Sequence, residues 1–175
     1  VTEGLKSADL VFLDIGANTG LYSLFMSQHV NAVHAIEPFP PVLDKLKNNM
    51  TLNSIQNIVI HPVGFGSKDA TMPFYPPPSS NQGVGSFSHE VSNSVVKESE
   101  VIVVSLPLRN GDSFLKEQNA TKIDLVKLDI EGYEKLALIG LKETMSINRP
   151  IVLMELNSSN PEPFQDEKDL TSTYL

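Results

Sequence analysis

Acidic side chains stand at the ends of apolar runs in this chain of 175 residues. Asp14 ends the run LVFLD, Glu37 ends AVHAIE, Asp129 ends IDLVKLD, and Glu155 follows PIVLM. Short apolar runs of this kind are typical of buried strands. A carboxylate at a strand end can accept a hydrogen bond from a hydroxyl, take up a proton or attract a cation. We therefore expect these acids to lie at the binding edge of a sheet.

The turn after the first run, GANTG at 16–20, resembles a dinucleotide-binding glycine loop with Asn in place of the middle glycine. Gly16 permits a tight turn, and Gly20 permits close packing of the following helix. Asn18 tolerates positive φ but removes the bare backbone that a pyrophosphate approaches. Asp14 would repel a diphosphate and attract a cation. S-adenosyl-L-methionine (SAM) has an ammonium, a sulfonium and no phosphate, so it suits this loop better than NAD.

Glu37 lies 17 residues after Gly20, at the end of the second apolar run. An acid at this position commonly accepts hydrogen bonds from both ribose hydroxyls of an adenosine cofactor. The alternative is a surface acid before a proline turn. Because the glycine loop and the acid occur together, we favour the ribose-binding interpretation.

A second group of acids gathers in the motif KLDIEGYE. Asp129 and Glu131 are two residues apart, so an extended backbone would point both side chains to one side. We predict that Glu131 contacts a hydroxyl group of the substrate or takes up its proton. Asp129 and Glu155 are further catalytic candidates, and Asp129 is also a candidate contact of the SAM amine. The structural alternative is N-capping by Asp129 and a helix-dipole contact by Glu131 or Glu134. The acids could hold Mg²⁺ or Ca²⁺, but their spacing matches no metal motif, so we predict no metal site.

Strands and helices must alternate to position these acids. The apolar pattern predicts strands at 10–14, 32–37, 57–62, 123–129 and 150–156. It predicts helices at 19–30, from residue 40 onward, and at about 133–146. Alternation of this kind implies crossovers and a parallel sheet. We therefore predict an α/β fold that binds its ligand at the carboxyl ends of the strands.

The interval between the third and fourth strands breaks this rhythm. Short strands at 72–75 and 101–105 predict a β-hairpin insertion. The segment 76–94 is rich in Pro, Ser, Gly and Asn and predicts a loop that covers the site. Asn110 or Asp112 should cap a short helix that follows.

Four stretches, DIGANTGLYS, AIEPFP, KLDIEGYE and VLMELN, occur in this order between residue 11 and about residue 157. Together they resemble the FkbM family of SAM-dependent methyltransferases. The resemblance implies a Rossmann-like class I methyltransferase fold with a parallel sheet in the order 3-2-1-4-5. It also implies methyl transfer from SAM, in many members to a hydroxyl of a sugar or natural product.

The same resemblance assigns cofactor-binding residues. Four positions match the motif that holds the methionine end of SAM: Asp14, Gly16, Asn18 and Gly20. Glu37 matches the ribose-binding acid. Gly64 and Phe65 stand where the family packs residues around adenine, although members more often have an Ala-Leu-Ser pattern there.

The composition limits the kinds of partner that the protein is expected to bind. A net charge of −8 argues against a broad electrostatic grip on nucleic acid, and no apolar run approaches the length of a membrane span. We expect one methyltransferase domain over 1–175 with a loose tail at 157–175, cut from a longer chain because Val1 is not a natural start. No leader is visible, but its absence says little in such a fragment. The compartment is left open with the cytoplasm favoured, and the oligomeric state is also open.

These observations favour an O-methyltransferase that acts on a small molecule or a saccharide. N-methylation is a variant of the same reading. One alternative is a non-catalytic methyltransferase-like module that binds an adenosine ligand or a partner protein. Another is a nicotinamide-dependent oxidoreductase, against which Asp14, Asn18 and the missing third glycine count.

Overall fold

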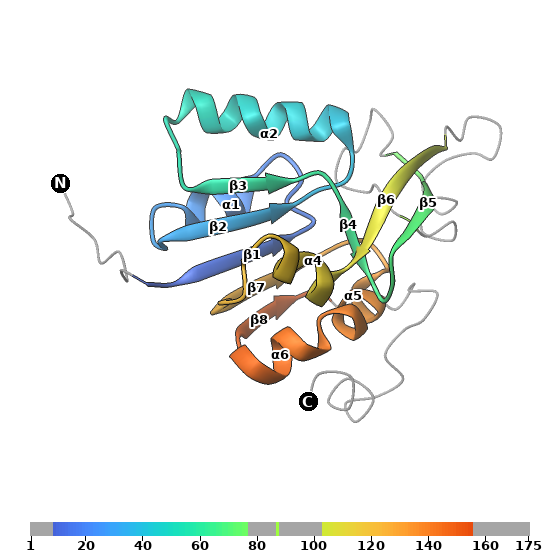
Figure 1. Ribbon diagram of the computed structural model, residues 1–175. Coiled ribbons are helices and arrows are strands. Elements are labelled where there is room, and N and C mark those ends of the chain that lie inside the picture. The colour runs from blue at the N-terminus through green and yellow to red at the C-terminus, as the bar shows by residue number, and fades with distance from the viewer. Residues whose placement is uncertain (1–8, 77–86, 88–102, 156–175) are drawn as a thin grey trace.

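The computed structural model describes residues 9–76, 87 and 103–155. Two sheets form in this part of the chain (Figure 1). The larger has five strands in the order β3-β2-β1-β7-β8, and every neighbouring pair is parallel. Its strands are β1 (Val11–Ile15), β2 (Ala32–Ile36), β3 (Ile58–His61), β7 (Leu125–Leu128) and β8 (Ile151–Met154). The expected Rossmann-like α/β class, with a parallel sheet, is confirmed.

Numbered along the whole chain, the strand order is 3-2-1-7-8 rather than the predicted 3-2-1-4-5. The difference arises because three strands lie between β3 and β7. These are β4 (Gly64–Gly66), β5 (Ala70–Phe74) and β6 (Val104–Asn110). The five strands of the larger sheet still place the first strand at the centre, between β2 and β7.

The insertion is larger than the predicted hairpin. β5 pairs antiparallel with β6, as a hairpin would, but β4 adds to β6 in parallel and completes a three-stranded sheet. The sequence GFG of β4 is too short and too rich in glycine to indicate a strand. Of the predicted loop at 76–94, only Pro76 and Phe87 are described, and the predicted tail at 157–175 lies outside the described residues.

Helices cover both faces of the larger sheet (Figure 1). One face carries α1 (Leu21–Met26) and α2 (Pro40–Leu52), and the other carries α4 (Gly111–Glu117), α5 (Glu134–Gly140) and α6 (Lys142–Asn148). The helix predicted at 19–30 is shorter in the structure, where α1 spans only Leu21–Met26. In the part of the chain that the structure describes, no helix combines the length and apolarity needed to cross a bilayer.

The helix predicted at 133–146 is in fact two helices, α5 and α6. The Asp112 carboxylate accepts hydrogen bonds from the backbone N–H groups of Glu143 and Thr144, at 2.7 and 2.8 Å, and so caps the start of α6. Asn110 caps α4 by accepting from the N–H of Ser113 at 3.0 Å, one of the two caps expected there. Both candidate capping residues are used, each on a different helix.

Candidate active site

A cavity of about 430 Å³ opens at the carboxyl ends of β1, β2 and β7. Most of the predicted site residues line it: Gly16, Asn18, Glu37, Gly64, Phe65, Asp129 and Glu131. The structure thus brings these residues together at the carboxyl ends of the strands, the edge at which open parallel sheets bind ligands. The remaining predicted residues lie around this cavity and are described below.

The loop after β1 has the conformation that its sequence predicts. Gly16, Asn18 and Gly20 all have positive φ, at 80°, 50° and 96°. A Cβ atom on Gly16 would lie 2.0 Å from the carbonyl oxygen of Asp129, so only glycine lets the loop approach the end of β7. A Cβ on Gly20 would lie 2.3 Å from side-chain atoms of Leu24 and Leu46. Gly20 thus permits close packing between the loop and helices α1 and α2.

Asp14 lies beneath this loop, on the face of the sheet that α1 covers. Its side chain is fully buried, and Oδ2 accepts a hydrogen bond from Ser23 Oγ at 2.6 Å. Lys127 Nζ lies 3.6 Å from the other carboxylate oxygen. Burial raises the pKa of Asp14, while the charge of Lys127 opposes the rise. Asp14 is not among the residues that line the cavity, and it lies beneath the glycine loop.

Glu37 is only 7% exposed, which removes the alternative of a surface acid. Its Oε2 accepts from the backbone N–H of Asn18 at 3.1 Å, and its Oε1 accepts from that of Phe39 at 3.0 Å. Burial raises the pKa of this carboxyl, and the two backbone hydrogen bonds lower it. Because a carboxylate oxygen can accept two hydrogen bonds, each oxygen of Glu37 can still accept one from a hydroxyl group in the cavity.

An aromatic wall, formed by Phe39, Phe74 and Phe87, lines the cavity beside Gly64. Ring centroids lie 5.5 Å apart for Phe39 and Phe74, and 5.1 Å apart for Phe74 and Phe87. A Cβ on Gly64 would lie 2.4 Å from the Phe87 ring, so the missing side chain makes room for that ring. The departure of Gly64 from the family pattern thus makes room for this wall, which the sequence alone did not indicate.

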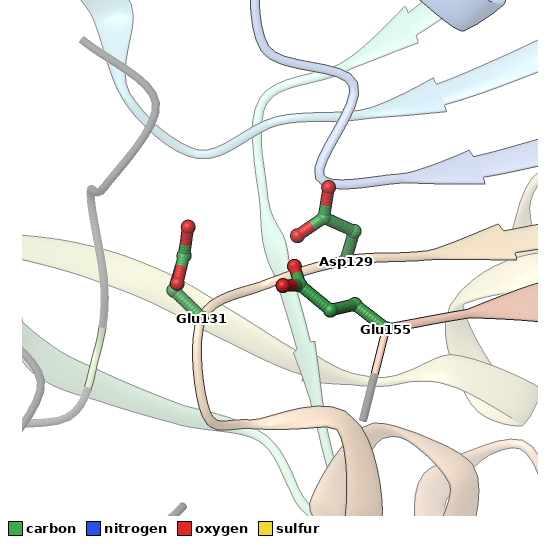
Figure 2. A group of neighbouring side chains, drawn as sticks. All are labelled: Asp129, Glu131 and Glu155. Carbon is green, nitrogen blue, oxygen red and sulfur yellow. The ribbon is translucent and has the colours of Figure 1, made fainter. Parts of the chain in front are cut away.

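Three carboxylates gather beyond the ends of β7 and β8 (Figure 2). Asp129, Glu131 and Glu155 each offer one oxygen, and these oxygens lie within 4.8 Å of one another. Glu131 has φ of 52°, so the expectation of an extended backbone at this residue is wrong. A left-handed turn, followed by Gly132 at φ 103°, brings the carboxylates together instead. Their spacing would admit a cation, but exposed acidic groups often gather without one, and we assign no metal.

Glu134 holds this turn in place. Its carboxylate is 1% exposed and accepts hydrogen bonds from the backbone N–H groups of Ile130, at 3.0 Å, and Gly132, at 3.1 and 3.2 Å to its two oxygens. The sequence suggested only a helix-dipole contact for this residue. In the structure it clamps the backbone on both sides of Glu131 and so fixes the direction of the Glu131 side chain.

The acid cluster changes the proton affinity of its members. Partial burial raises the pKa of Glu131 to about 7, and the charges of Asp129, Glu155 and Glu134 add to the rise. A hydrogen bond with Asp129 raises the pKa of Glu155. Like charges that crowd together in this way favour the retention of protons. The cluster therefore holds a carboxyl that exchanges its proton near neutral pH.

Lys127 is a site residue that the sequence reading missed. It lines the cavity, and its Nζ donates a hydrogen bond to the carbonyl oxygen of Gly16 at 2.7 Å. The same atom lies 3.5 Å from Asp129 Oδ2 and 5.6 Å from the centroid of the Tyr22 ring. The available signal was a single cation, flanked by apolar residues, inside the predicted strand IDLVKLD.

The parallel sheet, the glycine loop and the buried acid after β2 define a Rossmann-like α/β domain. The chain belongs to the methyltransferase FkbM domain family, whose model matches residues 14–173. It is similar to the hexuronic acid methyltransferase AglP of Haloferax volcanii, with 27% identity over 93% of this chain and 60% of that protein. It is also similar to methyltransferase 1 of Beauveria bassiana, with 27% identity over 77% of this chain and 59% of that protein.

A crystal structure of a methyltransferase FkbM from Methylobacillus flagellatus has the same fold. The TM-score is 0.63 at 20% identity, and the match covers 95% of this chain and 37% of that one. The chain spans about 60% of the length of AglP and of methyltransferase 1. Membership of the family is shown by the sequence match, and the arrangement of the strands is shared with a solved member.

Proposed function

We propose that the protein is a SAM-dependent methyltransferase that methylates a hydroxyl group on a saccharide or another small molecule. One observation carries the proposal. A single cavity is lined by the glycine loop and Glu37 and also by Asp129 and Glu131. An adenosine-containing cofactor held by the loop and Glu37 would present its sulfonium to acids that can bind and deprotonate an acceptor.

The cofactor site follows from the geometry of the loop. Gly16 and Asn18 would bind the methionine part of SAM, and the Glu37 carboxylate would accept its two ribose hydroxyls. Gly64 and Phe65, with the aromatic wall, would enclose the adenine. Asp129 faces the cavity near Gly16 and would accept a hydrogen bond from the ammonium of the methionine part. SAM would supply an activated methyl group with a good leaving group.

In the reaction that we propose, SAM would supply its methyl group to the acceptor oxygen, with the carbon–sulfur bond breaking and its electron pair staying on sulfur in S-adenosylhomocysteine. The acceptor hydroxyl would give up its proton, and Glu131 would receive it. A base with a pKa close to the working pH is the most effective, because it is free to accept and strong enough to do so. The pKa of about 7 for Glu131 meets this condition.

The acceptor class is supported by one relative, which is named a hexuronic acid methyltransferase. A sugar offers several hydroxyls, and the cluster of Asp129, Glu131 and Glu155 can accept hydrogen bonds from more than one of them. This pattern favours a polyol such as a saccharide over a simple alcohol.

Calorimetry with SAM, S-adenosylhomocysteine and NAD tests the cofactor assignment. We expect the first two to bind and NAD to leave the heat unchanged. A screen with methyl-labelled SAM against hexuronic acids, neutral sugars, small alcohols and amines then identifies the acceptor. Tight NAD binding would overturn the proposal. Binding of SAM without transfer to any acceptor would favour a non-catalytic module instead.

A further inference from the structure

Lys127 is a buried cation that the proposed reaction does not yet use. Its side chain is only 7% exposed, and a lysine is rarely buried to this extent without a specific partner. In the sheet register it stands opposite Asp14, and both side chains lie on the α1 face. Neutralisation of Asp14 is therefore the first explanation to consider.

The distances do not fit that explanation alone. Lys127 Nζ lies 3.6 Å from Asp14 Oδ1, and among the described residues this oxygen has no hydrogen-bond partner. The ammonium instead donates to the carbonyl of Gly16 at 2.7 Å, at the edge of the cavity. An ammonium has three N–H donors, so further donors stay available for an acceptor that enters the cavity.

Asp129 stands beside this ammonium. Its Oδ2 lies 3.5 Å from Lys127 Nζ, and both residues line the cavity next to the backbone of Gly16. A cation and an anion therefore face the same part of the cavity, a few ångströms apart. The α-carbon of an amino acid carries the complementary arrangement, a carboxylate and an ammonium on one atom. The two side chains match such a zwitterion, charge for charge.

We propose that Lys127 binds the α-carboxylate of the amino-acid part of the cofactor, beside the α-ammonium that Asp129 accepts. The inference rests on the proposed function, because it requires a cofactor that contains an amino acid. It gives Lys127 two roles: its hydrogen bond to Gly16 shapes the loop, and its remaining donors recognise the ligand. NAD has no α-amino acid group, so the same pair would also favour SAM over a nicotinamide cofactor.

Decarboxylated SAM provides the matched probe, because it keeps the adenosine, sulfonium and amine and lacks only the carboxylate. By calorimetry, we expect the wild-type protein to bind SAM at least about tenfold more tightly than this analogue, the usual worth of a charged hydrogen bond. Lys127→Met should weaken SAM binding by about 10- to 100-fold and leave affinity for the analogue nearly unchanged. Asp129→Asn should weaken binding of both ligands, since both carry the amine.

Lys116→Met removes an exposed lysine on α4 and controls for the loss of one positive charge. Lys127→Arg keeps the charge and should retain the preference for SAM, and it replaces Lys127→Met in the experiment if that variant does not fold. Equal wild-type affinity for the two ligands would overturn the inference. So would an equal loss for both in Lys127→Met, which would limit Lys127 to holding the loop. Failure of both ligands to bind the wild type would overturn the proposed function as well, whereas SAM binding without methyl transfer would overturn only that function.

Discussion

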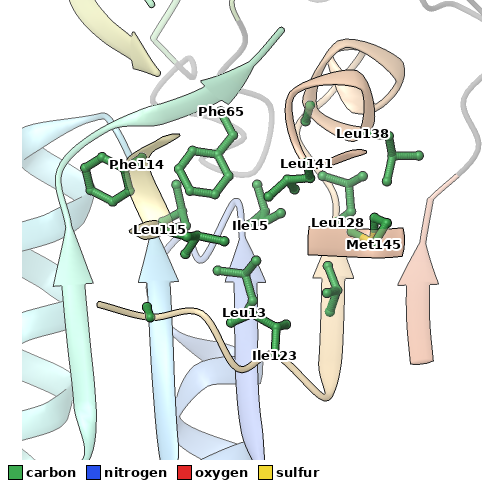
Figure 3. Close-up of a cluster of buried hydrophobic side chains, with 14 of the residues drawn as sticks. Leu13, Ile15, Phe65, Phe114, Leu115, Ile123, Leu128, Leu138, Leu141 and Met145 are labelled. Atoms are coloured by element: carbon green, nitrogen blue, oxygen red, sulfur yellow. The ribbon is translucent and has the colours of Figure 1, made fainter. Parts of the chain in front are cut away.

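β1 and β7 present two very different faces to the rest of the molecule. On one face their alternate side chains enter a fully apolar cluster with residues from α4, α5 and α6 (Figure 3). The residues of β1 and β7 in that cluster are Leu13, Ile15, Val126 and Leu128. On the opposite face, the same two strands place Asp14 and Lys127 directly across from each other, beside a second apolar cluster that includes Phe12. Two neighbouring strands thus bury only hydrocarbon on one face, and a pair of charges next to hydrocarbon on the other.

The difference separates stability from function. Apolar burial stabilises the fold without further requirements, whereas buried charges pay a desolvation penalty that well-packed apolar residues would avoid. Asp14 is fully buried and Lys127 nearly so, and Lys127 lines the cavity. The charged pair is therefore expected to contribute to ligand binding, and the apolar clusters to contribute the free energy of folding. Changes on the two faces should have separable effects, and the following predictions test this.

The largest effect is expected at the acid cluster, on turnover alone. Glu131→Gln keeps the shape of the side chain and removes the base, so kcat should fall by about 10²–10⁴. SAM affinity and melting temperature should barely change, and the rise of kcat/KM with pH near about pH 7 should disappear. Glu143→Gln, at an exposed position on α6, is the matched control. Normal turnover of Glu131→Gln on the true acceptor would remove Glu131 from the catalytic residues.

The next effect concerns the apolar face. Leu128 is fully buried in the cluster, so Leu128→Ala should lower the free energy of unfolding by about 2–5 kcal/mol. SAM affinity, measured at a temperature where the variant is folded, should stay close to that of the wild type. Lys127→Met, one position earlier in the same strand, should mainly weaken SAM binding and should change the free energy of unfolding less. Urea titration and calorimetry on both variants measure the two quantities, and a large loss of affinity in Leu128→Ala would contradict the separation.

A smaller effect is expected at the ribose end of the cavity. Glu37→Ala should weaken binding of SAM and S-adenosylhomocysteine by about 1–3 kcal/mol, because the ribose hydroxyls lose a charged acceptor. The backbone N–H groups of Asn18 and Phe39 also lose their partner, so a modest loss of stability should accompany it. Glu37→Gln keeps an acceptor oxygen and should lie between the wild type and Glu37→Ala. Unchanged affinity in Glu37→Ala would rule out ribose binding by this residue.

The smallest effect is the dependence of stability on pH. The folded protein raises the pKa of Glu131 from 4.5 to about 7, so between these values the folded state holds a proton that the unfolded state releases. This contribution to stability is complete below about pH 4.5 and is lost as the pH rises through about 7. Because Glu131 is partly exposed, screening should limit the loss to about 1 kcal/mol or less.

Melting temperatures of wild type and Glu131→Gln between about pH 4.5 and about pH 8 measure this contribution. The wild type should lose stability relative to the variant as the pH increases. A constant difference between the two proteins across this range would show that the surroundings of Glu131 do not perturb its proton affinity.

Local patterns in the amino-acid sequence were enough to predict the parallel sheet, the glycine loop and the acid after β2. These features depend on local rules, since strand periodicity, positive φ at Gly16 and Asn18, and the spacing to Glu37 are all set within a short stretch of chain. The same rules identified the acids of KLDIEGYE and their common edge of the sheet. They failed at Glu131, where a left-handed turn, held by hydrogen bonds from Ile130 and Gly132 to the buried carboxylate of Glu134, replaces the extended backbone.

Which charged residues from distant segments become neighbours is visible only in the folded molecule. Asp14 and Lys127 are far apart in the chain, and parallel pairing of β1 with β7 makes them neighbours. The ring of Phe87 reaches Gly64 through a similar long-range contact. Such contacts depend on strand register and on the packing of separate elements, for which a run of residues carries no local signal. For this reason the sequence could name the acids of the site, while the fold was needed to show that a buried lysine lies among them.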